Sequence, residues 1–501
     1  MEVKGGFWGP RFRTNRDVTL WHAFRCCEDT GRIANFSRAG GFEAGTHEGR
    51  RYDDSDVFKV VEGAAYALAQ QHCEKLDRYL DDLIAKIAAA QEDDGYLFTA
   101  RTPGRRDREI GARRWSHLRA SHELYNVGHL YEAAAAHYRA TGKTSLLNVA
   151  VKNASLVCRT FGSAEGQIID VSGHEEIEIG LVRLYNITGN PMYLKQAKFF
   201  IDMRGRVDKR SRLYGKQFQD HRPVVDQDTA VGHAVRGGYL YAGVADMVAS
   251  TEDRDYLEAI DRIWHDVVES KLYLTGSIGQ HGAGEGYTGP YELDNVKAYC
   301  ETCAAIALAL WNRRMFLLHG QAKYIDMLER TIYNGFLSGI ALSGDRFFYS
   351  NPLACNMKFK FNRGSLTREE WFDCACCPTN VVRFMPLIAG YVYAICENSV
   401  YVNLYVNSTA RIELPGNVVK LTQHTDYPWT GDIKLILEPQ ERGRFTLNLR
   451  IPGWTIGHPV PSELYRYLDD VFINWGITIN GCRVNEIPTE EGYATPRVGG
   501  W

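Results

Sequence analysis

The segment 373–380, which reads DCACCPTN, contains the three closely spaced cysteines Cys374, Cys376 and Cys377. Cysteines this close pair with each other only under strain, because an ordinary disulfide needs a wider separation of the Cα atoms. Their thiolates are instead suited to bind a soft or borderline metal ion. The segment therefore predicts either a structural zinc site or a reactive thiolate site.

Pro378 should open a helix, because proline suits the first helical position and an apolar run with helical spacing follows it. Cys376 and Cys377 would then lie just outside the helix N-terminus. Backbone N–H groups and the helix dipole lower the pKa of a thiol placed there. This placement favours a reactive thiolate over a purely structural site.

A second motif, ETCA (301–304), offers further metal ligands. Its carboxylate and its thiol are two positions apart, and on a helix these side chains would point to nearly opposite sides. We therefore expect extended chain just before a helix that begins near Cys303. One carboxylate and three sulfurs make a tetrahedral donor set suited to Zn²⁺, one ion per chain. The candidate ligands are Glu301, Cys303, Cys376 and Cys377, with Cys300 and Cys374 as alternatives that spacing alone does not exclude.

Glu285 lies in a glycine-rich stretch, 275–287, which reads TGSIGQHGAGEGY. The stretch is not a phosphate-binding loop, because it lacks the G-x-x-x-x-G-K-[ST] pattern and a following helix. A carboxylate in a glycine-flanked loop is a candidate catalytic acid. The alternative is an ordinary surface glutamate.

Three histidines, His122, His174 and His233, stand near expected helix starts, beside carboxylate or aromatic groups or near an arginine. One such histidine is usually a cap or a satisfied core residue. Three at similar positions favour a sugar-binding rim, where helix ends on one side of a helical domain meet.

The composition is that of an ordinary globular protein, with 45% hydrophobic and 24% charged residues among 501. A net charge of −3 gives no indication of a nucleic acid partner, and no apolar run has the length of a membrane span. The N-terminus shows no signal peptide. Several of the twelve cysteines lie in helix-like apolar patterns, so we expect a cytoplasmic, reducing location. A homodimer is compatible with these features.

The periodicity of apolar residues changes from 3.6 to 2 near residue 395, which predicts an all-α domain at 1–395 and an antiparallel β domain at 396–501. A helical domain of this size usually closes as a toroid of inner and outer helices. The expected helices span about 18–27, 53–65, 75–91, 121–140, 145–160, 174–188, 192–203, 228–249, 253–269, 303–318, 320–336 and 378–395. The expected strands span 400–406, 418–422, 433–437, 445–451 and 477–482. The chain stops at Gly499-Gly500-Trp501, so we expect an incomplete β-sandwich.

A set of motifs occurs together and in order along the chain. They are GFWGPR (6–11), YDDSDV (52–57), SHELYN (121–126), GHEEIEIGLVRLY (173–185), GHAVR (232–236), TGSIGQHGAGEGY (275–287), ETCA (301–304), ERTIYNG (329–335), FFYSNPL (347–353) and CACCPTN (374–380). The set resembles the β-L-arabinofuranosidases of glycoside hydrolase family 127 over the helical domain and the start of the β region.

The resemblance implies an (α/α)₆ barrel followed by a β-sandwich, and a retaining hydrolase that releases β-linked L-arabinofuranose from plant-derived glycans or oligosaccharides. It implies Zn²⁺ held by Glu301, Cys303, Cys376 and Cys377, with Cys376 as nucleophile and Glu285 as general acid/base. It also implies a sugar subsite lined by His122, His174, His233, Glu329 and Tyr349. Cys300 departs from the family pattern, in which small residues are commoner at that position.

Two other functions fit the same residues. The enzyme could act on another L-sugar or on a branched acid sugar of pectin. The chain could also be a non-catalytic, zinc-stabilised scaffold that binds glycans. A metal-free epimerase or lyase has no use for four converging zinc ligands.

Overall fold

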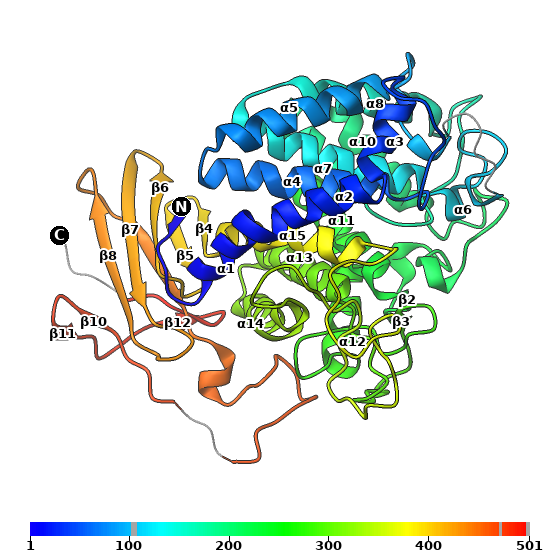
Figure 1. Ribbon diagram of the computed structural model, residues 1–501. Helices are drawn as coiled ribbons and strands as arrows, with labels where there is room; N and C mark the ends of the chain where they lie inside the picture. Colours follow the sequence, from blue (N-terminus) through cyan, green and yellow to red (C-terminus); the bar gives the residue numbers. More distant parts are fainter. Residues whose placement is uncertain (102–107, 470–472, 497–501) are drawn as a thin grey trace.

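The computed structural model describes residues 1–101, 108–469 and 473–496. A helix-rich N-terminal part is followed by a β-rich part, which lies to the left in Figure 1. The change falls just after helix α15 (Cys376–Leu387) and a 3₁₀ turn, where strand β4 (Tyr393–Cys396) begins. In the described part of the chain, no helix is long and apolar enough to cross a membrane.

The helical part agrees with most of the expected segments. Its other helices are α1 (Trp8–Thr14), α2 (Leu20–Asp29), α3 (Arg32–Ala39), α4 (Asp54–Gln70), α5 (Glu74–Ala89), α6 (Leu118–Ser121), α7 (Glu123–Thr141), α8 (Ser145–Thr160), α9 (Ile177–Thr188), α10 (Pro191–Met203), α11 (Ala234–Thr251), α12 (Arg254–Ser270), α13 (Thr302–His319) and α14 (Ala322–Arg330). Sequence analysis missed α1 and α3, and a π-helical segment, Thr331–Phe336, accounts for the longer helix expected at 320–336.

Helix α15 differs from the expectation at both ends. It begins at Cys376 instead of Pro378 and ends at Leu387, well before residue 395. Proline is tolerated throughout the first helical turn, because the N–H groups there have no partner within the helix. Cys376 and Cys377 are therefore the first two residues of the helix and do not lie outside it.

Close helix packing holds α15 against α4. A Cβ atom added to Gly63 of α4 would lie 2.6 Å from Val382 Cγ1 and 2.7 Å from its carbonyl oxygen, so only glycine fits there. Arg383, two turns into α15, is buried and pairs with Glu62 of α4 at 3.1 Å and with Glu132 of α7 at 2.5 Å. These contacts fix the position of the helix whose first turn carries the cysteines.

The β-rich part contains two sheets that share one hydrophobic core. One sheet has the order β1 (Glu2–Val3), β6 (Ser408–Leu414), β7 (Asn417–Thr425) and β8 (Ile433–Pro439). The other has the order β12 (Thr489–Glu490), β13 (Tyr493–Ala494), β9 (Thr446–Arg450), β5 (Ser399–Val402) and β4. A further hairpin joins β10 (Thr478–Ile479) and β11 (Cys482–Arg483).

Three features of this part were not expected. Strands β4, β6, β12 and β13 were missed. The first residues of the chain pair with β6, so the N-terminus adds a strand to its sheet. Strand β5 ends at Val402 rather than at 406. The expected break at Gly499-Gly500-Trp501 lies outside the described residues.

Arg450 of β9 joins the two parts. Its side chain is fully buried and pairs with Asp326 and Glu329 of α14, each at 2.5 Å. Breaking a buried ion pair is costly, because the remaining charges stay buried without compensation.

We therefore expect Arg450→Met to destabilise the protein by about 3–5 kcal/mol, because it leaves the carboxylates of Asp326 and Glu329 without their positively charged partner. Urea denaturation followed by circular dichroism would measure this loss. Arg411→Met is the matched control, because its pair with Glu413 is exposed and should matter little. Equal denaturation midpoints for the two variants would contradict the role assigned to Arg450.

Candidate active site

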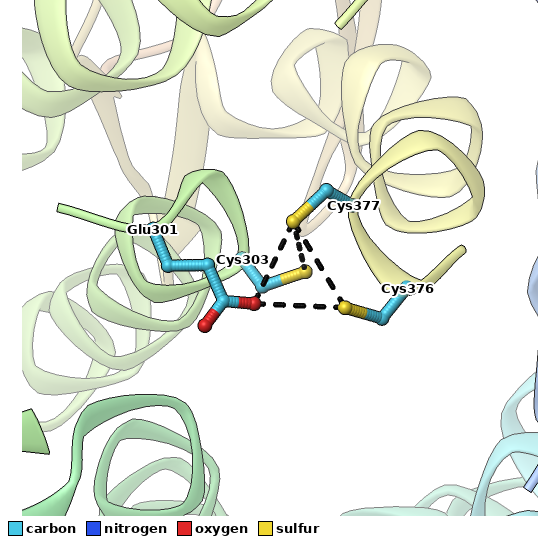
Figure 2. Close-up of side chains that lie close together, drawn as sticks. All are labelled: Glu301, Cys303, Cys376 and Cys377. Atoms are coloured by element: carbon cyan, nitrogen blue, oxygen red, sulfur yellow. Dashed lines mark hydrogen bonds between the residues drawn. The ribbon is translucent and has the colours of Figure 1, made fainter. Parts of the chain in front are cut away.

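Two helix N-termini meet at the cysteine motifs. Glu301 is the N-cap of α13 and has an extended backbone, with φ −59° and ψ 137°. Cys303 follows in the first turn of α13, and Cys376 and Cys377 open α15. Figure 2 shows the four side chains converging from these two helices. The extended conformation expected just before the helix near Cys303 is confirmed.

The donor atoms of the four residues lie within 4.8 Å of one another. Cys377 Sγ is 3.4 Å from Cys303 Sγ and 3.9 Å from Cys376 Sγ. Glu301 Oε1 is 3.5 Å from the Cys377 sulfur and 3.6 Å from the Cys376 sulfur. Around a tetrahedral zinc, bond lengths near 2.3 Å to sulfur and 2.0 Å to oxygen give sulfur–sulfur edges of about 3.8 Å and sulfur–oxygen edges of about 3.5 Å. These four residues therefore fit a tetrahedral metal site.

Burial adds a reason for a cation at this place. Glu301, Cys303 and Cys377 are almost fully buried. Glu301 Oε2 has no hydrogen-bond partner among the described residues. Burial raises the pKa of Glu301 and of Cys377 well above their ordinary values, so both are unfavourable as anions without a nearby positive charge.

Cys376 is the partly exposed member of the set. Its sulfur lies 3.1 Å from the hydroxyl of Tyr349, which is also 3.6 Å from Cys374 Sγ. Tyr349 thus contacts the sulfur expected to act as nucleophile. Cys300, the alternative ligand with an unusual identity, packs instead in a small apolar cluster with Tyr273.

The glycine-rich stretch places Glu285 beside this cluster. Strand β3 (Gly286–Tyr287) pairs with β2 (Gly232–His233), and a Cβ atom at Gly286 would lie 2.2 Å from a carbonyl oxygen of β2. Glu285 itself has a left-handed backbone, with φ 55°. Donor atoms of His233, Glu285 and Glu301 lie within 4.8 Å of one another.

Both carboxylate oxygens of Glu285 are engaged. His233 Nε2 is 2.9 Å from Oε2, and Tyr299 donates its hydroxyl proton to Oε1 at 2.7 Å. The Arg363 guanidinium also pairs with Oε1. Burial raises the pKa of Glu285, but the contacts with His233, Tyr299 and Arg363 outweigh it and lower the pKa to about 2. Glu285 is therefore a carboxylate in this state of the site.

The contacts of His233 indicate its tautomer. Its Nδ1 accepts hydrogen bonds from the backbone N–H groups of Val235 and Arg236, at 3.2 and 3.4 Å. Burial lowers the pKa of His233, so the ring is neutral and its proton is on Nε2. That proton points to Glu285, and His233 can donate it to the carboxylate.

The three expected histidines lie in a row. The ring centroids of His122 and His174 are 5.9 Å apart, and those of His174 and His233 are 5.7 Å apart. Burial lowers the pKa of His122 to about 3 and that of His174 well below its ordinary value. Nδ1 of His122 and Nδ1 of His174 each lie against a backbone carbonyl oxygen, at 2.7 and 2.9 Å. A neutral ring that donates from Nδ1 keeps Nε2 as an acceptor, which suits a sugar hydroxyl.

Glu329 lies where the helical part meets the β-rich part. Its carboxylate accepts hydrogen bonds from Arg450, at 2.5 Å, and from Trp454, at 3.4 Å. Both partners belong to the β-rich part, so an ion pair between the two parts of the chain occupies this carboxylate. A place for Glu329 in the sugar subsite stays a prediction.

Several residues that position the site were not singled out from the sequence. Thr379 of α15 donates its hydroxyl proton to Asp56, at 3.1 Å, and Arg32 pairs with the same carboxylate at 3.0 Å. Arg32 also donates to the backbone oxygen of Asp373, at 2.8 Å. Asp56 belongs to the YDDSDV motif, so this motif holds the cysteine segment in place. Arg363 has no motif that could have identified it.

Comparison with known proteins supplies the family. Residues 1–390 match the model of the β-L-arabinofuranosidase GH127 catalytic domain, and residues 399–497 match that of the GH127 middle domain. A non-reducing end β-L-arabinofuranosidase from Bifidobacterium longum is 34% identical over 456 residues, which cover 85% of this chain and 68% of the relative.

Solved structures agree. A GH127 β-arabinofuranosidase is 47% identical, with a TM-score of 0.92, over 99% of this chain and 76% of that one. A GH127 β-L-arabinofuranosidase from Geobacillus stearothermophilus T6 is 37% identical, with a TM-score of 0.91, over 100% of this chain and 79% of that one. With these matches and the cysteine–glutamate cluster beside Glu285, the chain belongs to glycoside hydrolase family 127 and is a glycoside hydrolase.

Proposed function

We propose that this protein is a retaining hydrolase that releases β-linked L-arabinofuranose from plant-derived glycans or oligosaccharides. The observation that carries the proposal is the position of Glu285 next to the cluster of Glu301, Cys303, Cys376 and Cys377. A retaining glycosidase needs a nucleophile on one side of the anomeric carbon and an acid on the side of the leaving group. Cys376 and Glu285 are suited to these two roles.

The proposal includes the architecture. We infer an (α/α)₆ barrel at 1–395 and a β-sandwich at 396–501, to which the first residues of the chain contribute one strand. The order of helices and the two sheets with a shared core support this division. The free state of all twelve cysteines supports a reducing, cytoplasmic location.

Zn²⁺ is the metal that we propose, because three sulfurs and one carboxylate oxygen form a donor set that it prefers. Glu301, Cys303, Cys376 and Cys377 would hold it. When bound, zinc would lower the pKa of the thiols that it contacts, so that Cys376 is a thiolate at neutral pH.

In the first step, Cys376 Sγ forms a bond to the anomeric carbon as the bond to the leaving oxygen breaks. The protonated form of Glu285 gives its proton to that oxygen and becomes the carboxylate that the second step needs. In the second step, Glu285 takes a proton from water, whose oxygen displaces the Cys376 sulfur. Tyr349 can donate a hydrogen bond to this sulfur as it leaves, since its hydroxyl is 3.1 Å away. His122, His174 and His233 would bind the hydroxyls of the arabinose ring.

The first prediction concerns the metal. We expect about one zinc per chain in protein purified without added metal, and a loss of most of it in Glu301→Gln and Cys303→Ser, because a tetrahedral site needs all four ligands. Elemental analysis measures the content. Cys300→Ala is the matched control and should keep the metal. Zinc-free but active protein, or full zinc in both ligand variants, would refute the proposed site.

The second prediction concerns the nucleophile. Cys376→Ser should lower turnover by at least about 10³-fold, because an alcohol at this place lacks thiolate reactivity. A haloacetamide carrying an arabinofuranose-like group should label Cys376 selectively, as seen by peptide mass spectrometry. Cys374→Ala should keep activity and labelling. Labelling mainly at Cys377, Cys374 or Cys300 would show that the role belongs to another thiol.

The third prediction concerns the acid. Glu285→Gln should slow the release of a sugar leaving group by about two to four orders of magnitude, because the amide cannot supply the proton. The rate at which the variant releases a nitrophenolate in the first step should fall much less, because this group leaves without a proton. An intermediate should then accumulate on Cys376, and azide should speed its release. Equal losses for both leaving groups, with no trapped intermediate, would mean that Glu285 only orients its loop.

A further inference from the structure

Arg363 lies at the solvent side of the site and belongs to none of the motifs. Its Nη2 pairs with Glu285 Oε1 and donates to Tyr299 Oη at 3.0 Å. Its guanidinium carbon is 4.0 Å from the centre of the Tyr349 ring. The side chain is 45% exposed, whereas that of Glu285 is 25% exposed. Arg363 therefore covers Glu285 from the outside.

The contact between Arg363 and Glu285 conflicts with the step in which Glu285 gives a proton to the leaving oxygen. A carboxylate oxygen has two lone pairs, and Glu285 Oε1 already faces two donors, Tyr299 and Arg363. The second oxygen faces His233. Of the three donors around the Glu285 carboxylate, Arg363 belongs to the most exposed side chain, so it can leave most readily. Arg363 has to turn away from Oε1 before that oxygen can hold a proton for transfer.

Arg363 has further N–H donors that could bind a sugar when it leaves Glu285. Both side-chain hydrogen bonds of Arg363 to described residues use Nη2, which leaves Nε and Nη1 available to a ligand. Stacking on the Tyr349 ring can hold the guanidinium plane in place while its donors change partners. Sugar hydroxyls are acceptors that this planar fork can bind.

We propose that Arg363 is a specificity-determining residue that recognises the sugar on the leaving-group side. This inference rests on the proposed hydrolase function. In the structure, Arg363 pairs with Glu285 Oε1. When a glycan substrate binds, Arg363 leaves Glu285 and donates to hydroxyls of the sugar that is about to depart. A nitrophenyl group offers no hydroxyls at this position and does not use Arg363.

The test compares kcat/KM for a β-L-arabinofuranosyl disaccharide and for nitrophenyl β-L-arabinofuranoside in zinc-replete protein. Arg363→Ala should lower the value for the disaccharide by about 10- to 100-fold, through the loss of one or two charge-assisted hydrogen bonds. The value for the nitrophenyl substrate should fall by much less than the value for the disaccharide, because a nitrophenolate offers no hydroxyls to Arg363 and leaves without a proton. Arg363→Lys should restore part of the loss, since lysine keeps one charged donor.

Arg368 provides the matched control. It lies in the same loop, packs over the ring of Phe348 and donates to the backbone oxygen of Ser338 at 2.7 Å. Arg368→Ala removes the same charge without removing a contact of Glu285, so kcat/KM should stay unchanged for both substrates. Hydrolysis of nitrophenyl β-L-arabinofuranoside by a variant also shows that this variant is folded.

A second measurement uses the reverse direction of the first step. Added arabinose should capture the arabinosyl group from Cys376 by binding where the leaving sugar sat, and Arg363→Ala should reduce this transfer relative to hydrolysis. If Arg363→Ala lowers kcat/KM equally for both substrates or for neither, and leaves the transfer to added arabinose unchanged, Arg363 does not recognise the leaving sugar. If the wild-type protein hydrolyses neither arabinofuranoside, the proposed function fails and this inference fails with it.

Discussion

The donor atoms of four groups that become anionic on metal binding lie within 4.8 Å of one another in a largely buried place, which requires a compensating positive charge. This constraint governs the helical part of the molecule. Glu301 and Cys303 lie at the N-terminus of α13, while Cys376 and Cys377 lie at that of α15, so the positive ends of two helix dipoles face the same point. A divalent cation would complete the compensation.

Holding two helix N-termini this close requires support from elsewhere in the chain. Asp56 anchors the start of α15 through Thr379 and is itself held by Arg32. One turn after Thr379, Arg383 connects the same helix to α4 and α7 through buried carboxylates. The chain thus surrounds the first two turns of α15 with ion pairs that are shielded from water. Such pairs specify one position of the helix more than they stabilise the fold.

The sequence was most informative where chemistry requires residues at short spacing. The motifs ETCA and CACCPTN identify the four clustered residues, and the glycines around Glu285 mark a loop in which close backbone pairing excludes side chains. Sequence could not predict the ion pair of Glu329, because its partner Arg450 is 121 residues away on strand β9. It could not identify Arg363 either, because a loop arginine becomes notable only when folding brings it to Glu285.

Zinc K-edge X-ray absorption of the purified protein would test the central claim most directly, because it reports the kind and number of atoms that surround the metal. The arrangement described here predicts three sulfur neighbours at about 2.3 Å and one oxygen at about 2.0–2.2 Å. Four sulfur neighbours would mean that Cys374 or Cys300 replaces Glu301, and a nitrogen neighbour would bring a histidine into the coordination. Either result would contradict the assignment of Glu301, Cys303, Cys376 and Cys377 as the ligand set.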